Sequence, residues 1–515
     1  MGAEQSVAIW SWVLMVLFIG LMIYFGYFGM RRTRNADDFA TARSSYGPIV
    51  LGLAVVATTA SGSTFMGMPG QAYSLGFASL WYPILYPIGI YGGMLLTARM
   101  VKLMGDKFGN RTIPEIVGER YQSEFLRVGL AILSLLLIYY IVAQLVAAAI
   151  MFETMMGLDY TVAVWITAIV LCIYLTMGGS HSDILTDAVQ GFLMLCIALL
   201  VLFMFLTGYG VSGGGMTAVN EAVKAKNPTA GWDTLFIPEH PTYGSAWLAF
   251  LLFIAHIPFG VLPHLGNKFL ALKNSRQLKV FLMFCVIAGA VLPMMALGGI
   301  LGLAVLDEPL SHADQVIPAL FKELFPPFVA ALLAVVVLSA ILSTSDGLIV
   351  SFSQIFANDL YRKTFAKNQT DEAKVERNAL IIGRVAVVGT ILLGVWMSYN
   401  PPESLAIFLW IGVGGMMAGL MGPLAIGALW RRANKQGAVA SFIVGVISYG
   451  LIYRDMIPRL EVYGNPFAAA GYSIFIASFV MVVVTLLTKP MPKEHVEKLF
   501  GPEKNSSTNQ SSFTS

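Results

Sequence analysis

One stretch of the sequence decides the fold: ATTASGST at residues 57–64, inside an apolar segment of residues 48–68. Small and hydroxyl-bearing residues fill this stretch, and Pro69 and Gly70 follow within two turns. A helix can break at such a place, and the carbonyl groups that lose their helical partners must then face protein or water. The other interpretation is a small-residue face that packs closely against a neighbouring helix. The stretch alone favours neither interpretation.

A second interruption lies in the apolar segment of residues 246–270. Pro258, Gly260 and Pro263 stand within six residues there, between His256 and His264. Two prolines and a glycine at this spacing predict a broken helix. The two interrupted segments are five helices apart along the chain. That spacing is typical of two five-helix repeats that each begin with a broken helix, as in ion-coupled secondary transporters.

The composition of the 515-residue chain excludes a soluble enzyme. Apolar residues make up 57% of the chain, charged residues only 12%, and the mean hydropathy is +0.74. A multi-pass membrane protein is therefore expected. The net charge of +3 and the lack of basic–aromatic runs exclude nucleic acid as a partner. The three cysteines all lie in apolar runs, so we expect small buried side chains rather than disulfides or metal ligands.

Thirteen apolar segments are predicted to be transmembrane helices, which makes the fold class all-α. They span residues 7–30, 48–68, 77–96, 128–156, 160–177, 184–206, 246–270, 280–306, 328–360, 384–399, 404–429, 438–453 and 466–487. Residues 1–488 are expected to form a single transmembrane domain. Residues 489–515, which end in a polar run, are predicted to be a disordered cytoplasmic tail.

The basic residues orient these helices. With the N-terminus outside, thirteen crossings place 27 of the 32 Lys and Arg residues on the inside. The five on the outside are Lys224, Lys226, Lys322, Arg454 and Arg459. Because cytoplasmic loops carry an excess of Lys and Arg, we expect an external N-terminus and a cytoplasmic C-terminus. The expected location is the plasma membrane, as the inner membrane of a bacterium.

Two further polar clusters lie inside predicted helices, where each polar group needs a partner. The ninth helix contains SAILSTSDG at residues 339–347, which includes Asp346. The sixth helix carries Asp183, Asp187 and Gln190 on one face by their i, i+4, i+7 spacing. Single hydroxyl residues often bond only to their own backbone. A carboxylate at this depth, however, needs a cation, a proton or a donor, so Asp187 is a candidate functional residue.

Several stretches of the chain resemble the sodium:solute symporter family, and most closely its pantothenate-permease-like members. The resemblance runs from about residue 24 to residue 435. It rests on SGSTFMGMPG at 61–70, GG at 178–179 with TDAVQ at 186–190, LPH at 262–264, VIP at 316–318, FPPF at 325–328, ILST at 341–344, DLY at 359–361 and WRR at 430–432.

The resemblance implies a leucine-transporter-type core of two inverted five-helix repeats. The repeats correspond to about residues 48–206 and 246–429, with flanking helices at 7–30, 438–453 and 466–487. The resemblance also implies a sodium site, built from backbone carbonyls of the broken second helix and from groups of the ninth. The matching positions are Ala57, Ala60, Ala340, Ser343 and Thr344. Five neutral oxygens suit a hard monovalent cation.

Some members of the family have a second cation site near the aspartate that matches Asp187. Their ninth-helix ligands are serines, whereas the matching positions here are Ser343, Asp346 and Gly347. If Asp346 faces Asp187, two carboxylates share a small site and hold either a cation or one proton between them. The resemblance therefore predicts a second coupled cation, Na⁺ or H⁺, at Asp187, Asp346 and Ser343.

The family places its solute beside the first break. The matching positions are Ser63, Thr64, Phe65, Tyr86, Tyr140, Gln144, His256, Phe259 and Gly415. The polar side chains that bind sugars in sugar-transporting relatives are replaced here by Thr64, Pro83 and Gly415, which argues against a sugar. No arginine is present among these positions, so a carboxylate would rely on helix N-termini, hydroxyl groups or a histidine. Core packing is the alternative role for each of these residues.

The expected function is secondary active transport: sodium-coupled symport of a small organic solute into the cell by alternating access. The expected solute is a carboxylate such as pantothenate or a short monocarboxylate. The alternatives are proton-coupled symport through Asp187 and Asp346, and a receptor that binds solute without moving it. An enzyme is disfavoured because no nucleophile and base stand together, and a channel because no filter-like repeat is present. Na⁺ is expected as the coupling ion, with no other cofactor, and the partners are sodium, the solute and the lipid bilayer.

Overall fold

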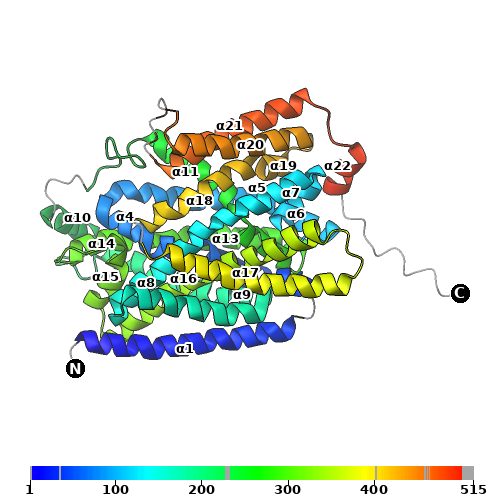
Figure 1. Ribbon diagram of the computed structural model, residues 1–515. Helices are drawn as coiled ribbons and strands as arrows, with labels where there is room; N and C mark the ends of the chain where they lie inside the picture. The colour runs from blue at the N-terminus through cyan, green and yellow to red at the C-terminus, as the bar shows by residue number, and fades with distance from the viewer. Residues whose placement is uncertain are drawn as a thin grey trace.

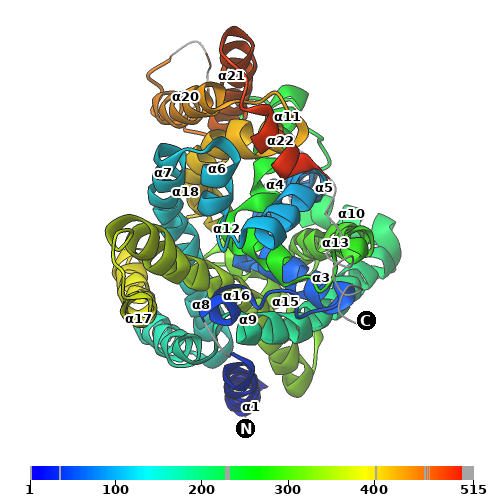
Figure 2. The same ribbon diagram turned by 90° about the vertical axis from the view of Figure 1, so that its right-hand side faces the viewer.

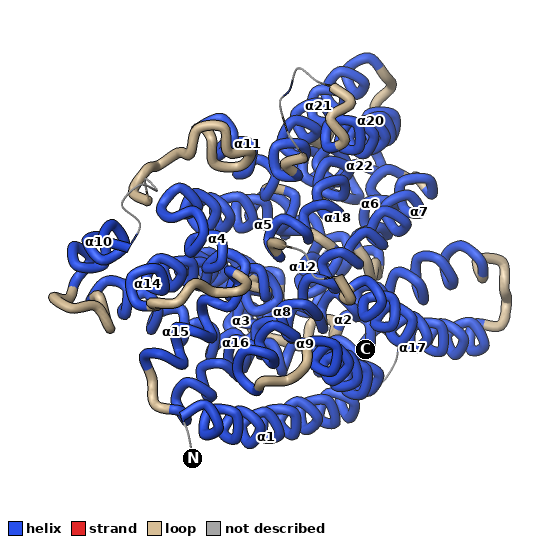
Figure 3. The backbone as a smooth tube through the Cα atoms, turned by 60° about the vertical axis from the view of Figure 1, so that its left-hand side comes forward, coloured by secondary structure: helices blue, strands red, loops and turns tan. Residues whose placement is uncertain are grey.

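The computed structural model describes residues 3–33, 36–226, 232–400, 403–457, 460, 462 and 464–501. Within these ranges the chain is built of helices joined by short loops (Figure 3). The label α marks an α-helix, and the label η marks a 3₁₀- or π-helical segment. The one strand-like pairing described is a parallel bridge between Tyr46 and Leu272.

The first half of the chain contains α1 (Ala3–Arg32), α2 (Ala36–Thr41), α3 (Pro48–Thr59), η1 (Ser63–Gly67), α4 (Met68–Leu75), η2 (Gly76–Leu80), α5 (Trp81–Phe108), α6 (Ile113–Tyr121), α7 (Glu124–Leu133), η3 (Ser134–Leu137), α8 (Ile138–Met156), α9 (Tyr160–Thr207) and α10 (Gly215–Lys226). The second half contains α11 (Ala246–His256), η4 (Pro258–Val261), α12 (Pro263–Gly266), η5 (Asn267–Ala271), η6 (Ser275–Gln277), α13 (Leu278–Val291), η7 (Leu292–Ala296), α14 (Leu297–Val305), η8 (Ala313–Gln315), α15 (Val316–Leu324), α16 (Pro327–Gln354), η9 (Ile355–Phe365), α17 (Glu372–Met397), α18 (Leu405–Leu420), η10 (Met421–Ile426), α19 (Gly427–Leu429), α20 (Lys435–Tyr453), α21 (Pro466–Leu487) and α22 (Lys493–Phe500).

The long helices run along a common axis (Figure 1). The end that holds α10, α14 and α15 is called the α10 side, and the opposite end, with α6 and α22, is called the α22 side. Seen along the axis, α16 lies inside the bundle and α1 lies on its rim (Figure 2). Accordingly, 83% of the most apolar stretch of the span Pro327–Phe365, which contains α16, is buried inside the protein. The corresponding value for the span at α1 is 28%. Helix α16 therefore packs against protein, and α1 presents apolar side chains to lipid.

The helix that begins at Pro48 breaks after Thr59. Gly47 is extended (φ −74°, ψ 166°), and Pro48 begins α3 because its ring fixes the φ of a first helical residue. Ala60 is extended again (φ −88°, ψ 96°), and helical geometry resumes at Gly62. The predicted first break is confirmed. The small residues also pack closely against a neighbouring helix, because a Cβ atom at Gly62 would lie 2.7 Å from Ala147 Cβ of α8.

The second predicted break is also confirmed. The stretches on either side of Leu262 are bent by 47° relative to each other. Leu262 is extended at this point (φ −51°, ψ 148°), and Pro258 and Pro263 stand at the starts of η4 and α12. A proline cannot donate to the helical ladder, so each of these residues begins a short helix instead of continuing the previous one.

The fifth and sixth predicted helices form one long element, α9, with a kink at Gly179. The backbone of Gly179 has a positive φ (φ 57°, ψ −155°), a conformation that residues with a Cβ atom rarely adopt. A Cβ atom there would lie 2.6 Å from the Phe39 ring and from the Phe39 carbonyl oxygen. Gly179 therefore provides both the kink and the space that lets α2 pack on α9.

Each of the thirteen predicted segments overlaps an apolar helix. Among the described residues, ten helices are long and apolar enough to cross a membrane, or eleven if the bent pair at Leu262 counts as one span. Two shorter apolar helices lie at Pro48–Thr59 and Tyr160–Ile173. The number of thirteen crossings therefore stays a prediction.

Two predictions are wrong. Residues Lys493–Phe500 of the predicted disordered tail form α22, whose Leu499 is buried and whose His495 Nε2 lies 3.3 Å from the Arg120 carbonyl oxygen. His495 and Leu499, which stand four residues apart, form the buried face with which this short helix docks on the bundle. Residues 502–515 lie outside the described part of the chain. Cys196 is exposed rather than buried, because it lies on the side of α9 that presents Phe192 and Leu199 outward.

Candidate sodium and solute sites at the first helix break

Predicted sodium ligands meet where α3 ends against α16. Ser343 Oγ lies 3.1 Å from the Ala57 carbonyl oxygen and 2.9 Å from that of Ala340. Thr344 Oγ1 donates to the carbonyl oxygen of Thr58 at 3.0 Å. All five predicted ligands, Ala57, Ala60, Ala340, Ser343 and Thr344, are buried. The break frees the last carbonyls of α3, and α16 supplies the hydroxyl groups that satisfy them.

This cluster consists of uncharged oxygen atoms, the ligand type preferred by hard cations. It joins four of the five predicted ligands and adds the Thr58 carbonyl, which was not predicted from the sequence. Ala60, the fifth predicted ligand, is buried at the break itself. A hydroxyl oxygen keeps a lone pair for a cation while it donates its proton to a carbonyl.

The other face of the break is held by α5 and α8. Tyr86 Oη donates to the Thr59 carbonyl at 2.7 Å, and the backbone N–H of Gly62 donates to Gln144 Oε1 at 2.8 Å. Tyr86 and Gln144 were both predicted to contact solute. In the structure they cap the two ends that the break exposes. Tyr86 caps a carbonyl of α3, and Gln144 caps the first N–H group of the half-helix that follows the break and consists of η1 and α4.

Aromatic rings from five parts of the chain form a contiguous group beside the break, the ring cluster. Its members are Tyr82, Tyr86, Tyr140, His256, Phe259, His264, Trp410 and Phe467, with ring centroids 4.5–6.3 Å apart in the contacting pairs. Four of these were predicted solute contacts. Tyr82, His264, Trp410 and Phe467 were not, because an aromatic residue in an apolar helix carries no sequence signal that separates a site from a core.

Buried polar atoms without hydrogen-bond partners among the described residues lie in and next to the ring cluster. They are Ser63 Oγ, His256 Nε2, and both ring nitrogens of His264. The three residues are at most 3% exposed. His256 Nδ1 lies 2.7 Å from the Leu252 carbonyl, so Nδ1 carries the proton of the neutral ring and Nε2 is an acceptor. Buried polar groups of this kind are normally satisfied, so these atoms mark a place for polar groups of a ligand or for water.

The remaining predicted solute positions differ in their surroundings. Thr64 and Phe65 are buried in η1, directly after the break. Gly415 lies against α20: a Cβ atom there would be 3.0 Å from the Tyr449 ring. The Tyr449 hydroxyl in turn donates to the Trp410 carbonyl at 2.9 Å. The observed role of Gly415 is thus to let α18 and α20 pack closely.

Asp187 has a cationic partner that was not assigned to it from the sequence. Lys268 Nζ lies 2.5 Å from Asp187 Oδ2 and 2.8 Å from Asp183 Oδ2. Thr58 Oγ1 donates to Asp187 Oδ2 at 2.6 Å. Asp346, the other acid of the predicted second cation site, is buried on α16. At the neighbouring Gly347 a Cβ atom would lie 2.8 Å from Thr58 Cγ2, so the absence of a side chain makes room for Thr58.

On the α10 side, the short helix η8 packs against α4, which continues the half-helix after the break. Asp314 Oδ2 accepts a hydrogen bond from the Leu405 N–H at 3.5 Å and lies 3.9 Å from His312 Nδ1. Gly70 leaves room for this carboxyl group, because a Cβ atom at Gly70 would lie 2.1 Å from Asp314 Oδ1. Burial raises the pKa of Asp314 to about 6, while the charge of His312 opposes this shift.

On the α22 side, a small cavity is closed by α2. The cavity is lined in part by Asp183, His264 and Lys268. The Ala40 carbonyl of α2 accepts from Gln354 Nε2 at 2.5 Å and from Ser180 Oγ at 2.6 Å. One backbone carbonyl therefore ties α2 to both α16 and α9.

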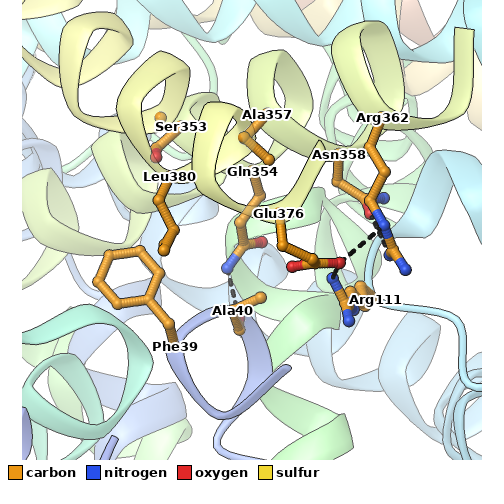
Figure 4. A pocket seen from close by; sticks show the side chains of 12 residues that line it. Phe39, Ala40, Arg111, Ser353, Gln354, Ala357, Asn358, Arg362, Glu376 and Leu380 are labelled. Atoms are coloured by element: carbon orange, nitrogen blue, oxygen red, sulfur yellow. Dashed lines mark hydrogen bonds and ion pairs between the residues drawn. The ribbon is translucent and has the colours of Figure 1, made fainter. Parts of the chain in front are cut away.

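Beyond this closure lies a second pocket, in which Gln354 bonds to Ala40 (Figure 4). Its polar end contains Glu376, whose Oε1 lies 3.0 Å from Arg362 Nε and 3.8 Å from Arg111 Nη1. Arg111 also pairs with Asp37 of α2. Burial would raise the pKa of Asp37, but the hydrogen bond and charge of Arg43, together with Arg111, lower it. These ion pairs hold α2 over the cavity.

Comparison with known proteins gives consistent results. The sequence model of the sodium:solute symporter family matches residues 39–445. The sodium/pantothenate symporter of Haemophilus influenzae is 30% identical over 457 residues, which cover 85% of this chain and 90% of that protein. The high-affinity proline transporter PutP of Bacillus subtilis is 29% identical over 477 residues, covering 89% and 95%. A solved structure of a Na⁺-coupled sialic acid symporter in an outward-open state superposes with a TM-score of 0.75 at 19% identity, covering 93% of this chain and 98% of that one.

Proposed function

The chain belongs to the sodium:solute symporter family, and we propose that it imports a small organic carboxylate together with Na⁺ by alternating access. The leucine-transporter-type fold and the pair of helix breaks support this mechanism. The proposed orientation places the α22 side in the cytoplasm of a bacterial cell, with the N-terminus outside, because most Lys and Arg residues fall on that side in the predicted topology.

The proposed sodium site consists of Ala57, Ala60, Ala340, Ser343 and Thr344. The observation that carries this proposal is the pair of bonds from the α16 hydroxyl groups to the freed carbonyls of Ala57 and Thr58. These bonds show that carbonyl and hydroxyl oxygens from two different helices already meet at one place. A cation there would be held by both helices at once, so it would stabilise one particular arrangement of α3 and α16.

The proposed carboxylate position is the beginning of the half-helix that contains Ser63, Thr64 and Phe65. Its first N–H groups now donate to side-chain oxygens, Gly62 to Gln144 Oε1 and Ser63 to Ser61 Oγ. A carboxylate oxygen is a stronger acceptor than either and is favoured at a helix N-terminus. Ser63 Oγ, which lacks a partner among the described residues, is a further donor for it.

The rest of the proposed site favours a solute with hydroxyl or amide groups and no ammonium group. His256 Nε2 is an acceptor that lacks a partner among the described residues, and it would accept from a hydroxyl or amide donor. Tyr86, Tyr140, Gln144 and Phe259 supply the apolar and neutral polar surroundings. None of the proposed solute residues is acidic, so none would pair with an ammonium group. Pantothenate, the solute named for one relative, fits this description better than proline, the solute named for another.

A ligand-stability screen of the purified protein tests the proposal. Pantothenate, lactate, proline and glucose would each be added with and without Na⁺, and the melting temperature would be measured. A ligand that binds only the folded state raises the apparent stability. We expect a shift with pantothenate or lactate that requires Na⁺. A shift with proline or glucose instead would refute the solute class, and equal shifts in Na⁺ and in choline would refute the coupling.

A further inference from the structure

Three buried charges from two parts of the chain form an ion triad: Lys268, Asp183 and Asp187. The two aspartates stand one turn apart on α9, and the Lys268 ammonium group from η5 lies between them at 2.8 and 2.5 Å. The exposed fractions of the three side chains are 5%, 4% and 0%. Ions this deeply buried are retained only with strong compensation, because their desolvation is costly. With both carboxylates ionised and the lysine protonated, the net charge of the triad is −1, compared with −2 for the two carboxylates alone.

The triad is joined to the proposed sodium site by a single residue. Thr58 donates its hydroxyl proton to Asp187 Oδ2 at 2.6 Å, and its own carbonyl accepts from Thr344 Oγ1 at 3.0 Å. Lys268 is thus linked through Asp187 and Thr58 to a proposed sodium ligand. The ammonium group of Lys268 pairs with the Asp187 carboxylate, which lies next to the proposed sodium site. This carboxylate is the group that would attract a second cation.

We propose that Lys268 is a built-in cation: its ammonium group takes the place of a second Na⁺ at Asp187, so that the protein binds one Na⁺ per solute. The proposal rests on the proposed sodium coupling. Two unit charges about 4 Å apart repel by about 4 kcal/mol at an effective dielectric constant of 20. A sodium ion at Asp187 would therefore have to displace Lys268 from a bond of 2.5 Å. Displacement of Lys268 is unfavourable, because its covalent attachment to η5 (the tether) keeps the ammonium group close to both carboxylates.

The position of Lys268 in the fold gives the tether a further consequence. Lys268 follows the second helix break by a few residues and lines the cavity that α2 closes. A movement of the η5 segment away from α9 would carry the cation with it and leave two carboxylates facing that cavity. The cation would return with the segment and would not be released into the cell, so it would not be counted in the transport stoichiometry.

The test is the number of Na⁺ ions bound per protein, measured with radioactive sodium on the purified full-length chain and compared with the Hill coefficient for sodium in solute uptake. We expect one bound ion and a Hill coefficient near one in the wild type. Lys268→Gln should vacate the position and give a second bound ion, and Lys268→Gln combined with Asp187→Asn should return the number to one. Lys102→Gln is the matched control, because Lys102 is equally buried and pairs with a different acid, Asp106, at 2.8 Å; it should leave the number at one.

The outcomes separate this inference from the proposal on which it rests. Two ions bound to the wild type would overturn the built-in cation, as would a folded Lys268→Gln variant that still binds one. No sodium bound to the wild type would overturn the sodium coupling itself. If Lys268→Gln does not fold, the wild-type number decides, and Lys268→Arg, which keeps the charge, is expected to bind one ion.

Discussion

Removal of both α16 hydroxyl groups in Ser343→Ala/Thr344→Ala tests the proposed sodium site most directly. The double substitution takes away two of the five proposed ligands. By comparison with hydrogen bonds to charged groups, each hydroxyl contributes about 1.5–3 kcal/mol to holding the ion. Loss of both therefore predicts a decrease in sodium affinity of about 100-fold to 10,000-fold. The measurement is the sodium concentration that gives half-maximal solute uptake in proteoliposomes.

Stability has to be followed in the same variants, because the hydroxyl groups also satisfy buried carbonyls. Their removal leaves the Ala57 and Thr58 carbonyls without these donors, at a cost of about 1–3 kcal/mol for each buried group. Ser345→Ala is the matched control. Its hydroxyl is equally buried on α16, but it donates within the helix to the Ile341 carbonyl at 3.0 Å. We expect Ser345→Ala to keep the sodium requirement of the wild type.

Two results would refute this reasoning. One is a double variant that folds and keeps its half-maximal sodium concentration within about threefold of the wild type, well below the effect of one lost ligand. The other is a shift in Ser345→Ala as large as that in the double variant. The second result would mean that sodium affinity responds to any loss of packing in α16 and not to the two hydroxyl groups at the break.

Three further predictions concern other parts of the structure. Gln144→Glu should raise the KM for a carboxylate solute more than tenfold, because a negative charge would then stand at the proposed carboxylate position; an unchanged KM in uptake assays would place the carboxylate elsewhere. The Asp314 pKa is raised from 3.8 to about 6 in the folded protein, so its contribution to stability is largest at low pH and falls as the pH rises through about 4–6. Asp314→Asn should remove this part of the pH dependence of the melting temperature, and a substitution of the exposed Asp307 should not. Gly179→Ala should lower the melting temperature by several degrees, whereas Gly20→Ala, where nothing lies within 4 Å, should leave it within about one degree.

The helix breaks could be predicted from the sequence because their causes are local. Proline and glycine act on the backbone of their own segment, so Pro258 and Pro263 identify the second break without knowledge of its neighbours. The residues 57–64 were ambiguous alone, and only their spacing from the second break favoured a broken helix. The family resemblance then identified Ser343 and Thr344, whose hydroxyl groups the structure places on freed carbonyls.

The contacts between segments could not be predicted in the same way. Lys268 and Asp187 are 81 positions apart, and no local pattern shows that one side chain reaches the other. Phe467 lies beyond both repeats, yet its ring contacts Trp410 at 4.9 Å. The short helix α22 is polar enough to resemble a disordered tail, and its docking depends on the surface of the bundle that buries Leu499. In each case the deciding partner belongs to a different segment.

The first break gives a physical reason why solute and sodium should bind together. The same few peptide groups expose carbonyls toward α16 and N–H groups toward α8. A cation at the carbonyls and a carboxylate at the N–H groups both fix the path of residues 57–63, so either ligand reduces the ordering cost that the other must meet. By linkage the effect is equal in both directions. Gln144, whose amide oxygen now accepts from the Gly62 N–H, would compete with the carboxylate and hold the break in shape while no solute is bound. A substitution that loosens this segment without touching either set of ligands should therefore weaken sodium and solute binding by the same factor.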